Sequence, residues 1–116
     1  MWIMVAGPYR SGGADAATRA ENLTVLNAAA LAVHGLGHVP VVGVNMALPL
    51  ITAAGDDDAA YEEIMTPLCL ALADRCDACL RIGGVSGGAD AEVARFMAAG
   101  RPVSRRVGEI PKAVRP

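Results

Sequence analysis

The chain has 116 residues, of which 53% are hydrophobic and only 3% aromatic, and its formal net charge at pH 7 is -2. This length predicts a single domain over residues 1–116, with a core built from Ala, Val, Leu and Ile. The slightly negative charge argues against a protein that binds a nucleic-acid backbone. No apolar run approaches the roughly 18 residues that a membrane helix needs, and no secretory signal is evident, so we expect a cytoplasmic protein without a membrane partner.

The first half of the chain predicts two strands separated by a helix. Residues 2–6 form a continuous apolar run that ends at a Gly-Pro pair, which is typical of a strand buried on both faces of a parallel sheet. A Gly/Ser-rich loop over 8–15 precedes helical spacing over 19–34. Residues 38–42 predict a second strand, and we expect it at a sheet edge because Pro40 has no N–H to donate.

The second half predicts two helices and two further strands. Residues 43–55 look irregular, with a short turn of helix near 46–51. The acidic cluster Asp56, Asp57 and Asp58 opens a helix to about Arg75, which we expect Pro67 to kink or split. The remaining elements are a strand over 77–82, a helix over 89–99 and a short strand over 102–104.

This alternation of strands and helices predicts a doubly wound α/β fold with a parallel sheet. Ligands of such folds bind outside the carboxyl ends of the strands. Two glycine-rich turns follow strands, at 7–13 and at 83–88. If the first and third strands are neighbours, both turns face one crevice.

The segment 82–92 carries the clearest functional signal, because it combines a strand end, a glycine-rich turn and a helix start. Unpaired N–H groups and a partial positive charge make a helix N-terminus suitable for an anion such as phosphate. We place Glu92 in the first turn, where the helix dipole would lower its pKa and keep it ionised. An ionised carboxylate can attack an anomeric carbon or stabilise an oxocarbenium ion. The plain alternative is an exposed capping carboxylate.

Several nearby residues are candidates for ligand binding, each with a structural alternative. Ser86 can bind a phosphate oxygen or simply cap the helix. Gly88 allows a ligand to approach the backbone or only permits unusual backbone angles. Arg10 offers a planar fork for phosphate, or is a solvated loop residue. Tyr9 can stack on a base or sugar, or close the loop over the sheet.

The other polar residues predict structural roles. Cys76 and Cys79 have C-x-x-C spacing, but they lie where a strand begins, so we expect small buried residues rather than redox or metal chemistry. The odd number of cysteines, the third being Cys69, fits a reduced compartment. His38 precedes a strand, away from the expected site, and with His34 it forms no metal constellation. No metal and no cofactor are therefore predicted.

Five stretches of the sequence together resemble one known superfamily. They are residues 4–11, 37–40, 75–77, 86–92 and 100–103. In order and spacing they resemble the nucleoside 2-deoxyribosyltransferase-like superfamily, especially its small DUF4406-type branch, over roughly residues 3–104. The resemblance implies a flavodoxin-like or Rossmann-like three-layer sandwich with a parallel sheet of four to five strands. It also implies an enzyme that cleaves or transfers the N-glycosidic bond of nucleosides or nucleoside 5′-monophosphates, commonly as a homodimer or higher homo-oligomer.

The resemblance assigns roles residue by residue. Glu92 matches the nucleophile, Ser86 matches a phosphate-contacting serine, and Gly7 and Arg10 match first-loop residues near the phosphate. Two positions depart from the pattern: Cys69 stands where relatives carry a proton-handling aspartate, and Met4 stands in place of an aromatic residue. Asp90 or the cluster at 56–58 are the possible substitutes for the missing acid.

Three other functions stay open from the sequence. One is a nucleotide-binding module of the same fold without catalysis, which the cysteine at position 69 favours. Another is a phosphoribohydrolase of the cytokinin-activating type, although the turn lacks that group's Pro and Thr. The last is an interaction protein with an inert α/β fold.

Overall fold

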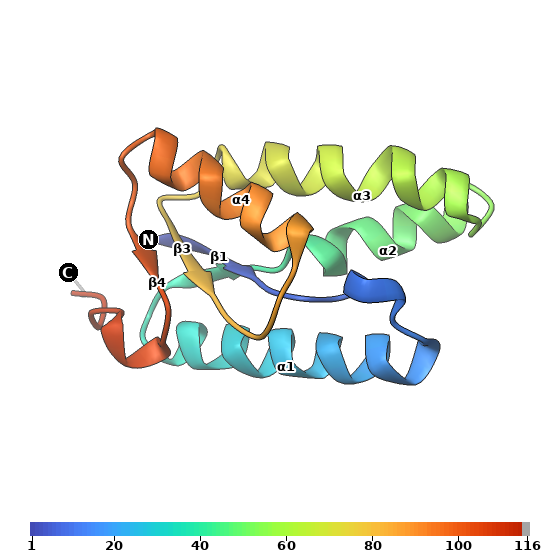
Figure 1. Ribbon diagram of the computed structural model, residues 1–116. Helices are drawn as coiled ribbons and strands as arrows, with labels where there is room; N and C mark the ends of the chain where they lie inside the picture. The colour runs from blue at the N-terminus through green and yellow to red at the C-terminus, as the bar shows by residue number, and fades with distance from the viewer. Residues whose placement is uncertain (115–116) are drawn as a thin grey trace.

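A four-stranded, all-parallel sheet forms the middle layer of the structure, a computed structural model that describes residues 1–114 (Figure 1). The strand order is β2-β1-β3-β4, and the strands are β1 (Trp2–Ala6), β2 (Val39–Val41), β3 (Ala78–Arg81) and β4 (Val103–Ser104). The α-helices are α1 (Ala16–Gly35), α2 (Gly43–Ala53), α3 (Asp58–Ala73) and α4 (Gly87–Ala98). Short 3-10 helices are η1 (Ser11–Gly13) and η2 (Val107–Glu109). The predicted α/β class with a parallel sheet is confirmed, with four strands; positions 115 and 116 of the expected domain lie outside the described residues.

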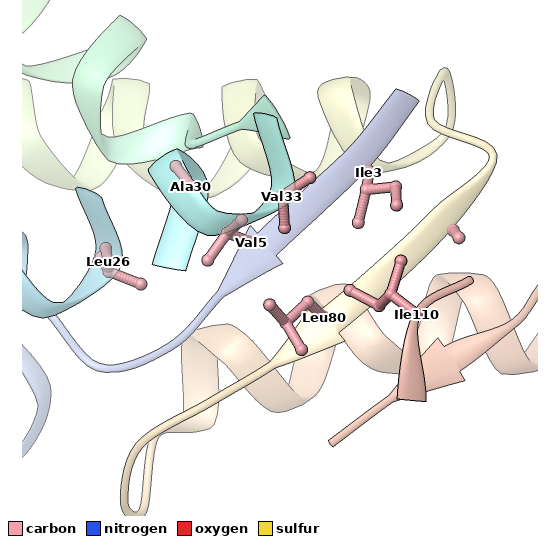
Figure 2. Close-up of a cluster of buried hydrophobic side chains, with 8 residues drawn as sticks. Ile3, Val5, Leu26, Ala30, Val33, Leu80 and Ile110 are labelled. Atoms are coloured by element: carbon pink, nitrogen blue, oxygen red, sulfur yellow. The ribbon is translucent and has the colours of Figure 1, made fainter. Parts of the chain in front are cut away.

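Alternate side chains of β1 point into two separate cores, one on each face of the sheet. Ile3 and Val5 pack with Leu80 of β3 against one side of α1 (Figure 2). Met4 and Ala6 point the other way, into a core that contains Phe96 of α4. Because both faces of the strand are buried, its sequence is apolar throughout rather than alternating. Figure 1 shows the result as three layers, with α1 on one face and α3 and α4 on the other.

The central pairing of β1 with β3 decides where a site can form. The register aligns Ile3 with Ala78 and Ala6 with Arg81, so the two strands end together. The loops that follow them therefore leave the sheet at the same edge, and the predicted shared crevice is confirmed. Edge placement of the second strand is also confirmed, since β2 pairs with β1 alone among the described strands.

Two expectations about the middle of the chain need correction. The stretch after β2 is a full helix, α2, although it contains Pro49. Pro67 does not split the following helix, because α3 continues through it as one element; the other possibility, a kink at Pro67, stays a prediction. A proline removes one backbone hydrogen bond, but it does not have to end a helix that tertiary contacts hold on both sides. Buried residues of α2 and α3 pack against each other in a common core and supply those contacts; they are Ala47, Ile51, Ala60, Met65 and Cys69.

The structural roles predicted for His38 and the cysteine pair are confirmed. His38 is buried; its Nε2 donates to the carbonyl of Pro111 at 2.7 Å, and its Nδ1 accepts from the amino group of Met1 at 2.9 Å. Cys76 and Cys79 are buried beside α4 and form no disulfide. None of the helices formed by residues 1–114 is long and apolar enough to cross a membrane.

Candidate functional site

A cavity of about 560 Å³ opens at the carboxyl ends of β1 and β3. Its walls come from the loop after β1, the start of α4 and one side of α3. In Figure 1 the loop that carries η1 lies beside the start of α4 at this end of the sheet. The structure brings together all six residues proposed as site residues, because each lines this cavity: Gly7, Tyr9, Arg10, Ser86, Gly88 and Glu92.

Ser86 joins the two glycine-rich loops at the helix start. It is buried and is the N-cap of α4, where its Oγ accepts from the backbone N–H of Ala89 at 3.1 Å. The hydroxyl of Ser11, from the first loop, donates to the same oxygen at 2.9 Å. These two bonds use both acceptor positions of the Ser86 hydroxyl and leave its own proton available. The structure therefore confirms the capping role and leaves a donor for a ligand.

The two glycines of the site, Gly7 and Gly88, differ in the space that a side chain would have. A Cβ on Gly7 would lie 2.9 Å from the carbonyl oxygen of Ile82, so glycine is required for the strands to approach. A Cβ on Gly88 would meet nothing within 4 Å, so no packing in the protein requires glycine there. Gly88 has helical geometry inside α4. Its bare backbone is thus open toward the cavity.

The predicted placement and charge of Glu92 need correction. Glu92 lies in the second turn of α4, which begins at Gly87, and the acidic residue of the first turn is Asp90. The dipole effect fades beyond the first turn. Burial instead raises the pKa of Glu92 to about 7, although a hydrogen bond from Cys69 and the positive charge of Arg81 limit the rise. Glu92 is thus a carboxyl group that titrates near neutral pH.

Cys69 occupies the position across from this carboxyl group. Burial and the nearby charge of Glu92 raise the pKa of the Cys69 thiol to about 12, so it stays neutral. Its hydrogen has two acceptors in reach, the carboxylate of Glu92 and, at 3.7 Å, the sulfur of Met65. The thiol is also tightly confined, since a Cβ on Gly43 would lie 2.5 Å from its sulfur.

Arg10 lines the cavity but is already engaged. Its guanidinium pairs with Asp58, the first residue of α3, at 2.6 Å and lies 4.2 Å above the ring of Tyr61. An incoming anion would therefore compete with Asp58 for Arg10. The proposed substitutes for the missing acid do not line the cavity: Asp57 caps α3 at Ala60, Asp58 pairs with Arg10, and Asp90 pairs with Arg81.

Sequence reasoning missed several residues of the site. Tyr61 and Glu62 of α3 line the cavity. Arg81, at the end of β3, carries a positive charge that lowers the pKa of Glu92. A signal existed for Arg81, because a charged residue closes an otherwise apolar strand. For Tyr61 and Glu62 the signal was the spacing to Cys69, since residues seven or eight apart share one side of a helix.

The described residues do not form a metal site of the usual kind. Within residues 1–114, no group of three or more His, Cys, Asp or Glu side chains is arranged to hold an ion. The cavity instead offers hydroxyl groups, open backbone, two tyrosine rings and two carboxylates. These groups suit an organic ligand with a polar or anionic end and a flat, apolar end.

Comparison with known proteins shows a likeness in structure. No protein-family model matches the sequence, and no curated protein matches it significantly. The chain is similar to the solved structure of a 2-deoxyribosyltransferase from the psychrotolerant bacterium Bacillus psychrosaccharolyticus. The TM-score is 0.57 and the sequence identity 18%, over 89% of this chain and 69% of that one. At this identity the likeness shows a shared fold, and it confirms the expected flavodoxin-like three-layer architecture.

Proposed function

We propose that this protein is an enzyme of the N-glycosidic bond, acting on nucleosides or nucleoside 5′-monophosphates with Glu92 as the nucleophile. The observation that carries the proposal is the position of Glu92: its carboxyl group lines a cavity whose other wall is built from the glycine- and serine-rich loop after β1. The shared fold with a 2-deoxyribosyltransferase supports the same class of chemistry.

The two ends of the cavity suit the two ends of a nucleotide. At one end, Ser86 has a free hydroxyl proton beside the N-terminus of α4, and Arg10 lies nearby, so a 5′-phosphate or 5′-hydroxyl would bind there. Away from Ser86, Tyr9 and Met65 offer aromatic and apolar surface for a base. The sugar would then lie between them, with its C1′ toward Glu92.

The proposed reaction has two steps. An oxygen of ionised Glu92 attacks C1′, the C1′–N bond breaks, and its electron pair leaves with the base nitrogen, which takes a proton from solvent. Water then displaces Glu92 from C1′ in a hydrolase, or the nitrogen of a second base does so in a transferase. The first step needs Glu92 as an ionised carboxylate, and the second step needs the same carboxylate to leave C1′. With a pKa of about 7, an appreciable fraction of Glu92 is ionised at neutral pH.

Base release tests this function directly. The purified protein would be incubated with each common ribo- and deoxyribonucleoside and 5′-monophosphate, with and without a second base, and products separated by chromatography. We expect free or exchanged base from the native chain and none from Glu92→Gln. Glu63→Gln is the matched control, since Glu63 is an exposed carboxylate on α3 that does not line the cavity. Undiminished release by Glu92→Gln would remove Glu92 from its role.

A second candidate function is a nucleotide-binding module without catalysis. The specific observation in its favour is Cys69, whose neutral thiol replaces the acid expected beside Glu92 and cannot give up a proton near pH 7. This function predicts that nucleotides raise the melting temperature while no base is released over long incubation. Product formation that depends on Glu92 would exclude it.

We further propose that the chain works as a homodimer or higher homo-oligomer in the cytoplasm. Large apolar side chains are exposed on and beside the edge strand β2, among them Trp2, Val39 and Met46, as expected of a surface covered by another subunit. The three free cysteines fit a reducing compartment. Sedimentation velocity would test the assembly, and Met46→Glu should shift the protein toward monomer.

A further inference from the structure

Arg81 is a buried arginine that the proposed reaction does not use. It is the last residue of β3, and only 7% of it is exposed. Cys79, two residues earlier on the strand, packs in the core beneath α4, so the period of two directs Arg81 to the same face. A buried guanidinium is costly unless its N–H groups are bonded and its charge is met.

Every hydrogen-bond partner of Arg81 among the described residues lies in the glycine-rich turn or at the start of α4. One guanidinium nitrogen donates to the carbonyl of Ile82, and the other donates to the carbonyl of Gly84 at 2.8 Å. Nε and one terminal nitrogen both donate to a carboxylate oxygen of Asp90 at 3.3 Å. The planar fork thus ties the strand end, the turn and the first turn of the helix into one unit.

The positive charge of the same guanidinium lowers the pKa of Glu92. The ionisable groups around Glu92 are the thiols of Cys69 on α3 and Cys79 on β3, both neutral, and Arg81 itself. Asp90 shares the charge of Arg81, but 65% of its side chain is exposed to solvent. Arg10 and Glu62 line the outer cavity, and Arg10 is paired with Asp58.

We propose that Arg81 is a positioning residue of this site: its fork fixes the turn that presents Ser86 and the first turn of the helix that carries Glu92. Arg81 touches no substrate and acts through the turn and through Glu92. The inference rests on the proposed function in one respect, that Glu92 is the reacting group. Its positioning part holds for any ligand of the cavity.

The titration of Glu92 tests the inference without any substrate. In protein labelled with carboxyl-¹³C glutamate, the Glu92 signal, assigned by its loss in Glu92→Gln, would be followed from pH 4 to 9. We expect Arg81→Gln to raise the midpoint by about one pH unit, because an opposite charge is removed. Arg81→Lys should restore most of the shift, and Asp90→Asn should lower the midpoint because Arg81 is then shared with no other carboxylate. Arg95→Gln is the matched control, since Arg95 lies on α4 with Glu92 but pairs with Asp74 outside the cavity.

The outcomes separate this inference from the proposed function. An unchanged midpoint in folded Arg81→Gln would overturn the inference even if base release were observed. The expected shifts without any base release would support the inference and count against the enzyme. A purely structural arginine would lower the melting temperature of Arg81→Gln and Arg81→Lys alike without moving the midpoint. If Arg81→Gln does not fold, Asp90→Asn decides, and an unchanged midpoint in that variant overturns the inference.

Discussion

The thiol of Cys69 on α3 faces the carboxyl group of Glu92 on α4 inside the cavity, and each changes the ionisation of the other. Donation from the thiol lowers the pKa of Glu92, against the larger effect of burial, whereas the charge of Glu92 helps burial to raise the pKa of Cys69. The thiol stays neutral across the physiological range, while the carboxyl group titrates near pH 7. The pair therefore supplies a single proton-exchanging group.

Glu92 is expected to make the protein less stable as pH rises. Its pKa is raised from 4.5 to about 7 in the folded chain, so between these values the native state binds more protons than the unfolded state. Stability contributed by this group is complete below pH about 4.5 and is lost as pH rises through about 7, by on the order of 1–3 kcal/mol. Urea unfolding of the native chain and Glu92→Gln at pH 5 and pH 8 measures this. The variant should gain relative stability at pH 8; an equal difference at both pH values would contradict the raised pKa.

Replacing the thiol with an acid should increase catalysis. In Cys69→Asp a second carboxyl group faces Glu92, and two carboxylates in one site hold one pKa high, which makes one of them a proton donor at neutral pH. If the proposed function holds, we expect base release at least about 10-fold faster than in the native chain. Cys69→Ser, which has similar size and no acid, is the control. Equal rates for the two variants would show that proton delivery to the base does not limit the reaction.

Arg10 should distinguish phosphorylated from unphosphorylated ligands. We expect Arg10→Gln to weaken binding of a nucleoside 5′-monophosphate by about 10-fold, since a charge-assisted bond to phosphate is lost, and to leave nucleoside binding nearly unchanged. Asp58→Asn should have the opposite effect, because it frees Arg10 from its ion pair. Calorimetry with both ligands measures the two affinities. Arg19→Gln, on α1 and outside the cavity lining, controls for net charge. Parallel losses for both ligands would place Arg10 away from the phosphate.

Replacing Gly88 should change the stability of the protein and its affinity for ligand in opposite directions. Since a Cβ there meets nothing within 4 Å and the residue is helical, Gly88→Ala should stabilise the protein by about 0.5–1 kcal/mol. The added methyl group would enter the cavity and should reduce ligand affinity several-fold. Gly35→Ala is the control, because Gly35 is also helical and open but lies at the far end of α1. Unchanged affinity in Gly88→Ala would show that the ligand does not approach this backbone.

The sequence carried enough information to predict the sheet and the edge where the site forms. The unbroken apolar run at 2–6 marks β1 as buried on both faces, and Pro40 marks β2 as an edge strand. Glycine-rich turns after β1 and β3 then indicate one crevice, which the strand order confirms. These features depend on local chemistry, and local chemistry is what a sequence displays.

The missed features depend on contacts between distant elements. Pro49 and Pro67 stay inside helices because α2 and α3 pack on each other, which no local rule predicts. The pKa of Glu92 rises because the folded chain buries it, which its position in the sequence does not reveal. Arg81 is visible in the sequence as the charged end of an apolar strand, but its bonds to the turn become visible only once the chain is folded.

The scarcity of aromatic residues has an optical consequence. The chain has two tyrosines, and both line the cavity, whereas its one tryptophan, Trp2, begins β1 at the opposite end of that strand. A base stacked on Tyr9 would change tyrosine absorbance and quench tyrosine emission, while Trp2 emission stays steady as an internal reference. The unlabelled protein thus carries its own fluorescence reporter for ligand binding, suited to screening substrates before any product is known.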